Sequence, residues 1–275
     1  MPYKLSWVIA LLALASGGSG VAALAPPGGA GSRPDSIGLA GSLPGEPRPA
    51  APAAGKTADE VIADYIAARG GRARWDAIRT VRLTGKVSGG GLRELPITVE
   101  KKRPDKSRRE LDDPKGRLIT AFDGRTAWQL GGPDGGTRVR PLPEAAVRQV
   151  RRSTDFDGPL VDYKAKGSQV DFLGRERVGD AEAYRLRIRF KEGDEAFFDF
   201  DTKTHLLIRS VAVVPTPAGT QEVEVSYRDY KKAGGVLWPH TEVSAAQPSF
   251  TQTFSWDKIE PNVPLDDRIF KMPAY

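Results

Sequence analysis

The 275-residue sequence contains no cysteine and only two histidines. The absence of cysteine excludes disulfides, thiol catalysis, a Cys-ligated zinc site and acylation at a lipobox cysteine. His205 and His240 lie outside any His-Glu-x-x-His pattern, so we interpret them as turn or surface residues. The sequence also lacks a Gly-x-Ser-x-Gly elbow and a glycine-rich phosphate loop followed by Lys-Ser/Thr. We therefore predict no catalytic residue, no metal site and no cofactor.

Two carboxylate pairs are the remaining candidates for chemistry: Asp155 with Asp157, and Asp199 with Asp201. Paired carboxylates serve glycoside hydrolysis or metal binding. Acids two residues apart in a strand share one face, and we expect the second pair to lie on the solvated face. Asp157 is followed by Gly158, which is typical of a turn. A hydrolase that uses the first pair stays a minor hypothesis.

The net charge of +6 does not indicate nucleic acid binding, because Lys and Arg are interleaved with Asp and Glu. No nucleic-acid-binding motif accompanies the charge. An excess of this size favours anionic partners such as lipid head groups.

The N-terminus has the pattern of an export signal. Lys4 precedes an apolar run from Leu5 to Leu14, and small residues follow, so we predict a signal peptide over 1–23. Cleavage within 13–15 and an uncleaved anchor over 5–25 are the alternatives, although about 20 apolar residues are needed to span a bilayer. Residues 24–56 are rich in Pro, Gly and Ala and predict a disordered linker before a domain over 57–275.

The predicted domain begins with a helix and continues as strands. Thr57 and Glu60 form a capping-box pattern, and Val61, Ile62, Tyr65 and Ile66 fall on one helical face. A short helix is expected over 143–152, with Val147 and Val150 facing inward. Elsewhere apolar residues alternate with polar ones, which indicates an antiparallel sheet of about ten strands with an apolar face and a charged face. The fold class is therefore α+β with a long curved sheet.

Large apolar side chains would gather on one face of this sheet. The candidates are Trp128, Leu186, Ile188, Phe190, Phe198, Phe200, Val225 and Trp256. Large aromatic side chains dominate most protein interiors, so a filled core is one interpretation. Two or three helices leave much of such a face to be covered, so an apolar cavity is the interpretation we favour. The arginines 185, 187 and 189 alternate with these residues, and we assign them to the solvated face, with contact to anionic lipid as the alternative.

Several phrases in the sequence resemble a known family. They are Phe-Asp-Gly-Arg-Thr-Ala-Trp-Gln at 122–129, Phe-Asp-Gly-Pro-Leu-Val-Asp-Tyr at 156–163 and Phe-Phe-Asp-Phe-Asp at 197–201. Tyr-Arg-Asp-Tyr-Lys-Lys-Ala-Gly-Gly-Val-Leu-Trp-Pro at 227–239 and Val-Pro-Leu-Asp-Asp-Arg-Ile-Phe at 263–270 are two more. In order and spacing these resemble exported proteins of the LolA/LolB-like superfamily, the outer-membrane lipoprotein carriers and sorting proteins.

The resemblance implies an unclosed half β-barrel, a strongly curved antiparallel sheet with helices covering its concave face. It implies that the apolar hollow takes a lipid or the acyl chains of a lipoprotein, and that the helices over 57–69 and 143–153 act as lids. It places the protein in the periplasm, in transient contact with a membrane or a membrane protein. A sensor or scaffold of the same fold, like the regulator RseB, is the alternative.

Overall fold

A computed structural model describes residues 56–90, 92–114, 116–131, 137–216, 219–246 and 250–273. The expected signal peptide lies outside the described residues, and so does the expected linker except for Lys56.

The domain is built on one antiparallel sheet of thirteen strands. The order across the sheet is β6-β5-β4-β3-β2-β1-β13-β12-β11-β10-β9-β8-β7. In chain order the strands are β1 (Thr80–Gly89), β2 (Leu92–Lys102), β3 (Lys106–Asp113), β4 (Gly116–Phe122), β5 (Ala127–Leu130), β6 (Val139–Pro141), β7 (Gln169–Val178), β8 (Ala181–Arg189), β9 (Glu195–Asp201), β10 (Leu207–Thr216), β11 (Gly219–Ala233), β12 (Val236–Ala246) and β13 (Phe250–Pro261).

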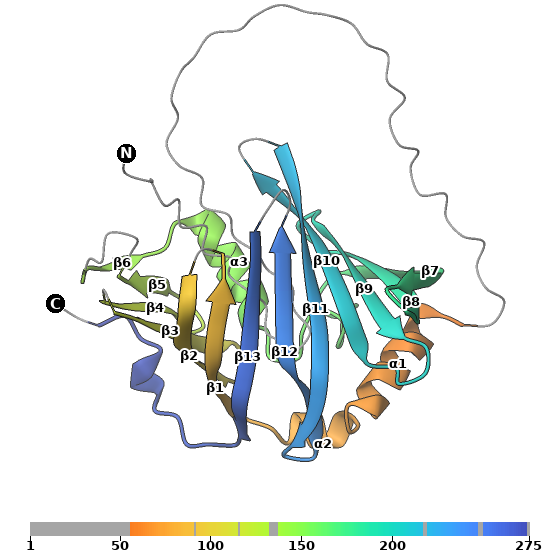
Figure 1. Ribbon diagram of the computed structural model, residues 1–275, viewed down its shortest axis with the longest axis horizontal. Coiled ribbons are helices and arrows are strands. Elements are labelled where there is room, and N and C mark those ends of the chain that lie inside the picture. Colours follow the sequence, from red (N-terminus) through yellow and green to blue (C-terminus); the bar gives the residue numbers. More distant parts are fainter. Residues whose placement is uncertain are drawn as a thin grey trace, which may run out of the picture.

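The sheet consists of two meanders that meet in its middle. Every neighbouring pair is consecutive in the chain except β1 and β13, the first and last strands. In Figure 1, β1, β13, β12 and β11 run side by side at the centre, and β6 and β7 lie at opposite sides of the sheet. Because β6 and β7 are its two edges, the sheet is not closed, which is consistent with an unclosed half-barrel.

The helices are few among the described residues. α1 (Ala58–Ala68) and α2 (Arg72–Asp76) both precede the first strand, and α3 (Glu144–Thr154) belongs to the connection between the two edge strands. The predicted capping box is confirmed, since the Thr57 and Glu60 side chains each bond the other's backbone N–H. Pro143 is the N-cap of α3 rather than a residue of its first turn. A 3-10 turn, η1 (Asp267–Ile269), lies in the C-terminal tail.

Glycine is required where strands approach closely. At Gly85 the register between β1 and β13 shifts, and a Cβ atom there would lie 2.0 Å from the Ser255 carbonyl oxygen. A side chain at this bulge would therefore force the two central strands apart. Gly70 ends α1 with a φ of +125°, and a Cβ atom there would lie 2.5 Å from the Gly235 carbonyl oxygen.

The strand pattern is confirmed more fully in the second half of the domain than in the first. The Gly234-Gly235 turn, within the phrase at 227–239, joins β11 to β12, and β13 and the C-terminal tail follow. The alternation does not identify β3, β6 and β7: β3 is mostly charged, β6 has three residues, and β7 is interrupted by a register shift between Phe172 and Gly174. The expectation that Asp199 is solvated was wrong: its side chain is fully buried on the charged face, beneath Arg185 and Arg209.

Candidate functional site

One large cluster of buried apolar side chains lies between α1, α2 and the sheet, and we call it the main apolar cluster. It includes seven of the eight residues predicted to line a cavity, each no more than 9% exposed: Leu186, Ile188, Phe190, Phe198, Phe200, Val225 and Trp256. Strands β8, β9, β11 and β13 supply six of them, and Phe190 directly follows β8. Strands β1 and β2 add Val81, Leu83, Val87, Leu95, Ile97 and Val99. One face of the sheet is thus apolar over most of its width, as the alternation predicts.

α1 packs against this cluster through the face that the sequence predicted. Val61, Ile62 and Tyr65 are buried in it, and Ile66 is partly buried against it. The rings of Tyr65 and Phe200 lie 5.0 Å apart, centroid to centroid, in a tilted arrangement. In the first turn of the helix, Asp59 accepts hydrogen bonds from Lys164 and Tyr163, and these lower the pKa of its carboxyl.

Arg69 joins the C-terminal end of α1 to the sheet. Its side chain is 6% exposed, and its Nε and Nη1 atoms donate to the Leu237 carbonyl and to the Tyr65 hydroxyl at 3.1 Å each. The guanidinium also lies 4.2 Å from the Trp75 ring centroid. Its Nη2 atom has no hydrogen-bond partner among the described residues. The two acceptors and the aromatic face still hold the rest of the buried cation, so Arg69 fixes this end of the helix.

Three of the predicted residues lie outside the main apolar cluster. Val150 is buried with Phe122 and Ala127 in a smaller cluster, and Val147 packs against that cluster. Trp128 belongs to a further cluster with Ile119 and Ala121, and its Nε1 atom donates to the Phe270 carbonyl at 2.8 Å. The structure therefore does not bring Trp128 together with the seven other candidates.

The charged face of the sheet carries a cross-strand network of ion pairs. Arg209 of β10 contacts Asp199 at 2.7 Å and Glu176 at 2.8 Å, and Arg185 of β8 contacts the same two acids. Arg187 and Arg189 both contact Asp171 of β7. Burial raises the pKa of Asp199, whereas Arg185 and Arg209 outweigh burial at Glu176 and lower its pKa. The arginines 185, 187 and 189 are thus engaged by acids of their own sheet face.

The first carboxylate pair also has structural partners. The two Asp157 carboxylate oxygens accept from Trp75 Nε1 at 2.8 Å and from Arg103 at 2.6 Å. Burial would raise the pKa of Asp157, but the contacts with Arg103 and Trp75 outweigh it and lower that pKa. Asp157 thereby ties the segment after α3 to α2 and to the β2–β3 turn, and it does not have the raised pKa of a general acid.

The two histidines lie outside these networks of charged side chains. His205 lies in a turn with a φ of +57°, and its Nδ1 atom is 4.0 Å from the Asp64 carboxylate. His240 Nδ1 bonds the Trp256 carbonyl oxygen at 2.6 Å. Across the described ranges, no group of three or more His, Asp or Glu side chains could hold a metal ion, and no helix is long and apolar enough to cross a bilayer.

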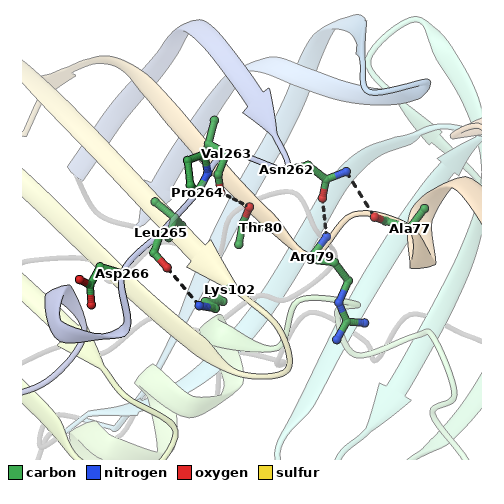
Figure 2. A pocket seen from close by; sticks show the side chains of 9 residues that line it. All are labelled: Ala77, Arg79, Thr80, Lys102, Asn262, Val263, Pro264, Leu265 and Asp266. Carbon is green, nitrogen blue, oxygen red and sulfur yellow. Dashed lines mark hydrogen bonds between the residues drawn. The ribbon is translucent and has the colours of Figure 1, made fainter.

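A pocket of about 810 Å³ lies where the C-terminal tail leaves β13 (Figure 2). Asn262 accepts from the Arg79 backbone N–H and donates to the Ala77 carbonyl, while Thr80 donates to the Val263 carbonyl at 2.5 Å. Lys102 donates to the Leu265 carbonyl at 3.0 Å. These side chains hold the tail against β1 and β2, so we interpret the pocket as part of the packing between the tail and the sheet.

Sequence reasoning missed three charged side chains on the apolar side of the sheet: Lys101, Arg109 and Glu242. Lys101 follows Leu95, Ile97 and Val99 at the same two-residue spacing, so the alternation already places it on the apolar face. Arg109 pairs directly with Val99 in the register of β2 and β3. Glu242 is 1% exposed, and nothing in its local sequence distinguishes it from a surface acid.

Comparisons with known proteins support the fold. No family model and no curated protein matches the chain. A DUF1329 family protein from Desulfovibrio piger superposes with a TM-score of 0.56 and 12% identity, over 78% of this chain and 97% of that chain. A putative outer membrane lipoprotein-sorting protein domain from Vibrio parahaemolyticus gives 0.53 and 12%, over 78% and 97%. A LolA superfamily protein from Nitrosomonas europaea gives 0.51 and 12%, over 79% and 98%. The chain has a LolA-like fold.

Proposed function

We propose that the protein is a non-catalytic carrier that binds a lipid, or the acyl chains of a lipoprotein, against the apolar face of its sheet. The carriage would take place in the periplasm, reached through the N-terminal export signal. The proposal depends mainly on the main apolar cluster, in which a face many strands wide is covered by one three-turn helix, one short helix and the segment after α3 that supplies Phe156 and Leu160. The LolA-like fold supports it by analogy.

The bound chain would take the place of α1, which packs against the main apolar cluster. α1 is held by the exposed pair Asp59 with Lys164 and by the partly exposed pair Lys56 with Asp64. Exposed pairs contribute little, about 0–1 kcal/mol each. Each methylene of an acyl chain that leaves water gains about 0.8 kcal/mol. A long chain can therefore offset the loss of the contacts that Val61, Ile62 and Tyr65 make.

The first test measures co-purifying lipid on the full chain, in the native protein and in two variants. The protein is purified without detergent and analysed by native and denaturing mass spectrometry for a stoichiometric lipid or acylated peptide. Phe198→Glu places a carboxylate in the main apolar cluster and should abolish co-purification. Phe197→Glu is the matched control, because Phe197 is the neighbouring residue on the opposite face of β9.

Tethering α1 tests the movement separately from folding. Since the chain has no cysteine, Asp59→Cys with Lys164→Cys creates a unique pair that a short bismaleimide can bridge. Bridging should prevent uptake of a fluorescent fatty acid. The control pair, Lys86→Cys with Glu94→Cys, joins β1 to β2 far from α1 and should leave uptake unchanged.

A clean protein that binds no lipid and no fatty acid before tethering would refute the carrier function. The main apolar cluster would then be a filled core. The alternative, a sensor or scaffold of the same fold that binds a membrane protein, would take its place.

A further inference from the structure

The apolar side of the sheet also contains a group of polar side chains, and we call it the inner polar group. Its members are Lys101, Arg109, Glu242, Ser244 and Gln252. The strand register places them together: Arg109 is opposite Val99, Glu242 is opposite Phe254, and Ser244 is opposite Gln252. Val99 and Phe254 belong to the main apolar cluster, so the inner polar group borders it directly.

Arg109 reaches across the sheet toward Glu242. Its guanidinium lies 5.1 Å from the ring centroid of Phe254, although β3 and β13 are separated by β2 and β1 in the strand order. The curvature of the sheet therefore brings the two halves of this face within the reach of one side chain. Glu242 accepts a hydrogen bond from Trp256 Nε1 at 3.0 Å and attracts both Arg109 and Lys101.

Lys101 lies at the end of α3. Its side chain is 2% exposed, and its Nζ atom donates to the Ser153 carbonyl in the last turn of that helix at 2.8 Å. Burial lowers the pKa of Lys101 to about 8 and that of Arg109 to about 10, so the attraction of nearby carboxylates does not compensate for burial at either cation.

Two buried polar atoms of the group have no hydrogen-bond partner among the described residues: Ser244 Oγ and Gln252 Oε1. The side chains are 0% and 7% exposed and oppose each other across β12 and β13. Leaving such atoms unsatisfied is unfavourable, and native structures seldom do so without a ligand or a water. Because the orientation of a side-chain amide is an assignment, Gln252 can present either its oxygen or its NH₂ group.

We propose that the inner polar group binds the anionic head of an amphiphile, a carboxylate or a phosphate, whose acyl chain lies along the main apolar cluster. This inference rests on the proposed carrier function and specifies its cargo. Lys101 and Arg109 supply the charge, Ser244 and Gln252 supply hydrogen bonds, and Glu242 holds Trp256 and the cations in place. Charge-assisted hydrogen bonds in a site of low polarity are the strong ones.

The test compares ligands that differ only in their heads. The delipidated full chain is titrated by calorimetry with oleate, oleoyl lysophosphatidate and uncharged oleyl alcohol. At least one of the two anionic lipids should bind ten times more tightly than oleyl alcohol or better, and the tighter one identifies the preferred anion. Inorganic phosphate at millimolar concentration should displace neither.

The variants locate the effect. Arg109→Gln should remove most of the anionic preference and leave the binding of oleyl alcohol unchanged. Its matched control is Arg108→Gln, because Arg108 lies on the other face of β3, where it pairs with Glu110. Gln252→Leu removes an unsatisfied amide, so the free protein should keep its melting temperature or gain, while the anionic preference falls. This variant tests the site even if Arg109→Gln does not fold.

Each other outcome overturns the inference. Equal affinity for charged and uncharged lipids would leave the carrier function intact and refute the head site. Equal losses in Arg109→Gln and Arg108→Gln would show a general effect of surface charge. Displacement by phosphate would show a site for the free anion rather than for an amphiphile. Failure of all three lipids to bind would refute the carrier function itself.

Discussion

Lys101 offers the sharpest test of the structure, because it is a buried cation with a lowered pKa. Burial holds the pKa of Lys101 at about 8, against an ordinary value of 10.5, even though Asp155 and Glu242 attract the charge. Its ammonium group donates to the Ser153 carbonyl at the end of α3. The folded protein therefore releases this proton at a lower pH than the unfolded chain does.

The consequence is a stability that rises with pH over a defined window. Between about pH 8 and pH 10.5 the unfolded chain binds more protons at Lys101 than the folded protein, so the free energy of unfolding increases with pH. Below this window both states are protonated and the burial cost is constant, and above it both are neutral and the cost is gone. The change is about 3 kcal/mol, since each pKa unit corresponds to about 1.4 kcal/mol.

Lys101→Met keeps the aliphatic stem and removes the titration. We expect the difference in unfolding free energy, variant minus native, to fall by about 3 kcal/mol as the pH rises from 7 to 10.5. Urea denaturation of both proteins, followed by tryptophan fluorescence across this range, measures it. Other titrating groups are common to both proteins and cancel in the difference.

Lys86→Met is the matched control. Lys86 is exposed, and a hydrogen bond to Glu94 raises its pKa, so the pair's stabilisation is present below the ordinary pKa and is lost at higher pH. Its difference curve should be small and should slope in the opposite direction. A difference curve for Lys101→Met that stays flat from pH 7 to 10.5 would show that Lys101 is solvated, and the inner polar group would lose a member.

Three further substitutions test the packing. Arg69→Met should lower the unfolding free energy by about 2–3 kcal/mol in urea denaturation, because it removes two hydrogen bonds and the contact with Trp75. The control Arg74→Met, at an exposed site, should cost about 0.5 kcal/mol or less. Equal effects of the two substitutions would contradict the role of Arg69. Trp128→Phe leaves the Phe270 carbonyl without its donor and should cost about 1–3 kcal/mol while fatty-acid uptake is unchanged; a loss of uptake would mean that Trp128 lines the cavity after all. Gly85→Ala should lower the unfolding free energy by more than about 2 kcal/mol, since its Cβ meets a backbone oxygen. In Gly179→Ala the Cβ meets open space, so the loss should be about 1 kcal/mol, from its left-handed backbone. Similar melting temperatures for the two variants would argue against the close approach of β1 and β13.

Local patterns were enough to locate the helices and most strands. The Thr57–Glu60 capping box and the Gly70-Gly71 end specify α1 through contacts within a few residues. The two-residue alternation in β8, β9 and β13 identifies the buried face, because side chains point to opposite sides of a strand in turn. Seven of the eight predicted lining residues are found together for this reason. The alternation does not identify β3, whose side chains are mostly charged, or β7, where a register shift between Phe172 and Gly174 interrupts it.

Tertiary structure alone decided which faces meet. Alternation places Trp128 on one side of β5 but cannot say that this side packs beneath Phe270 instead of joining the main apolar cluster. It gives Asp199 to the charged face but cannot show that Arg185 and Arg209, from other strands, bury it. The inner polar group depends on the pairing of β1 with β13 and on the curvature that lets Arg109 reach Phe254. Such contacts join residues far apart in the chain, so the periodicity of any one segment carries no information about them.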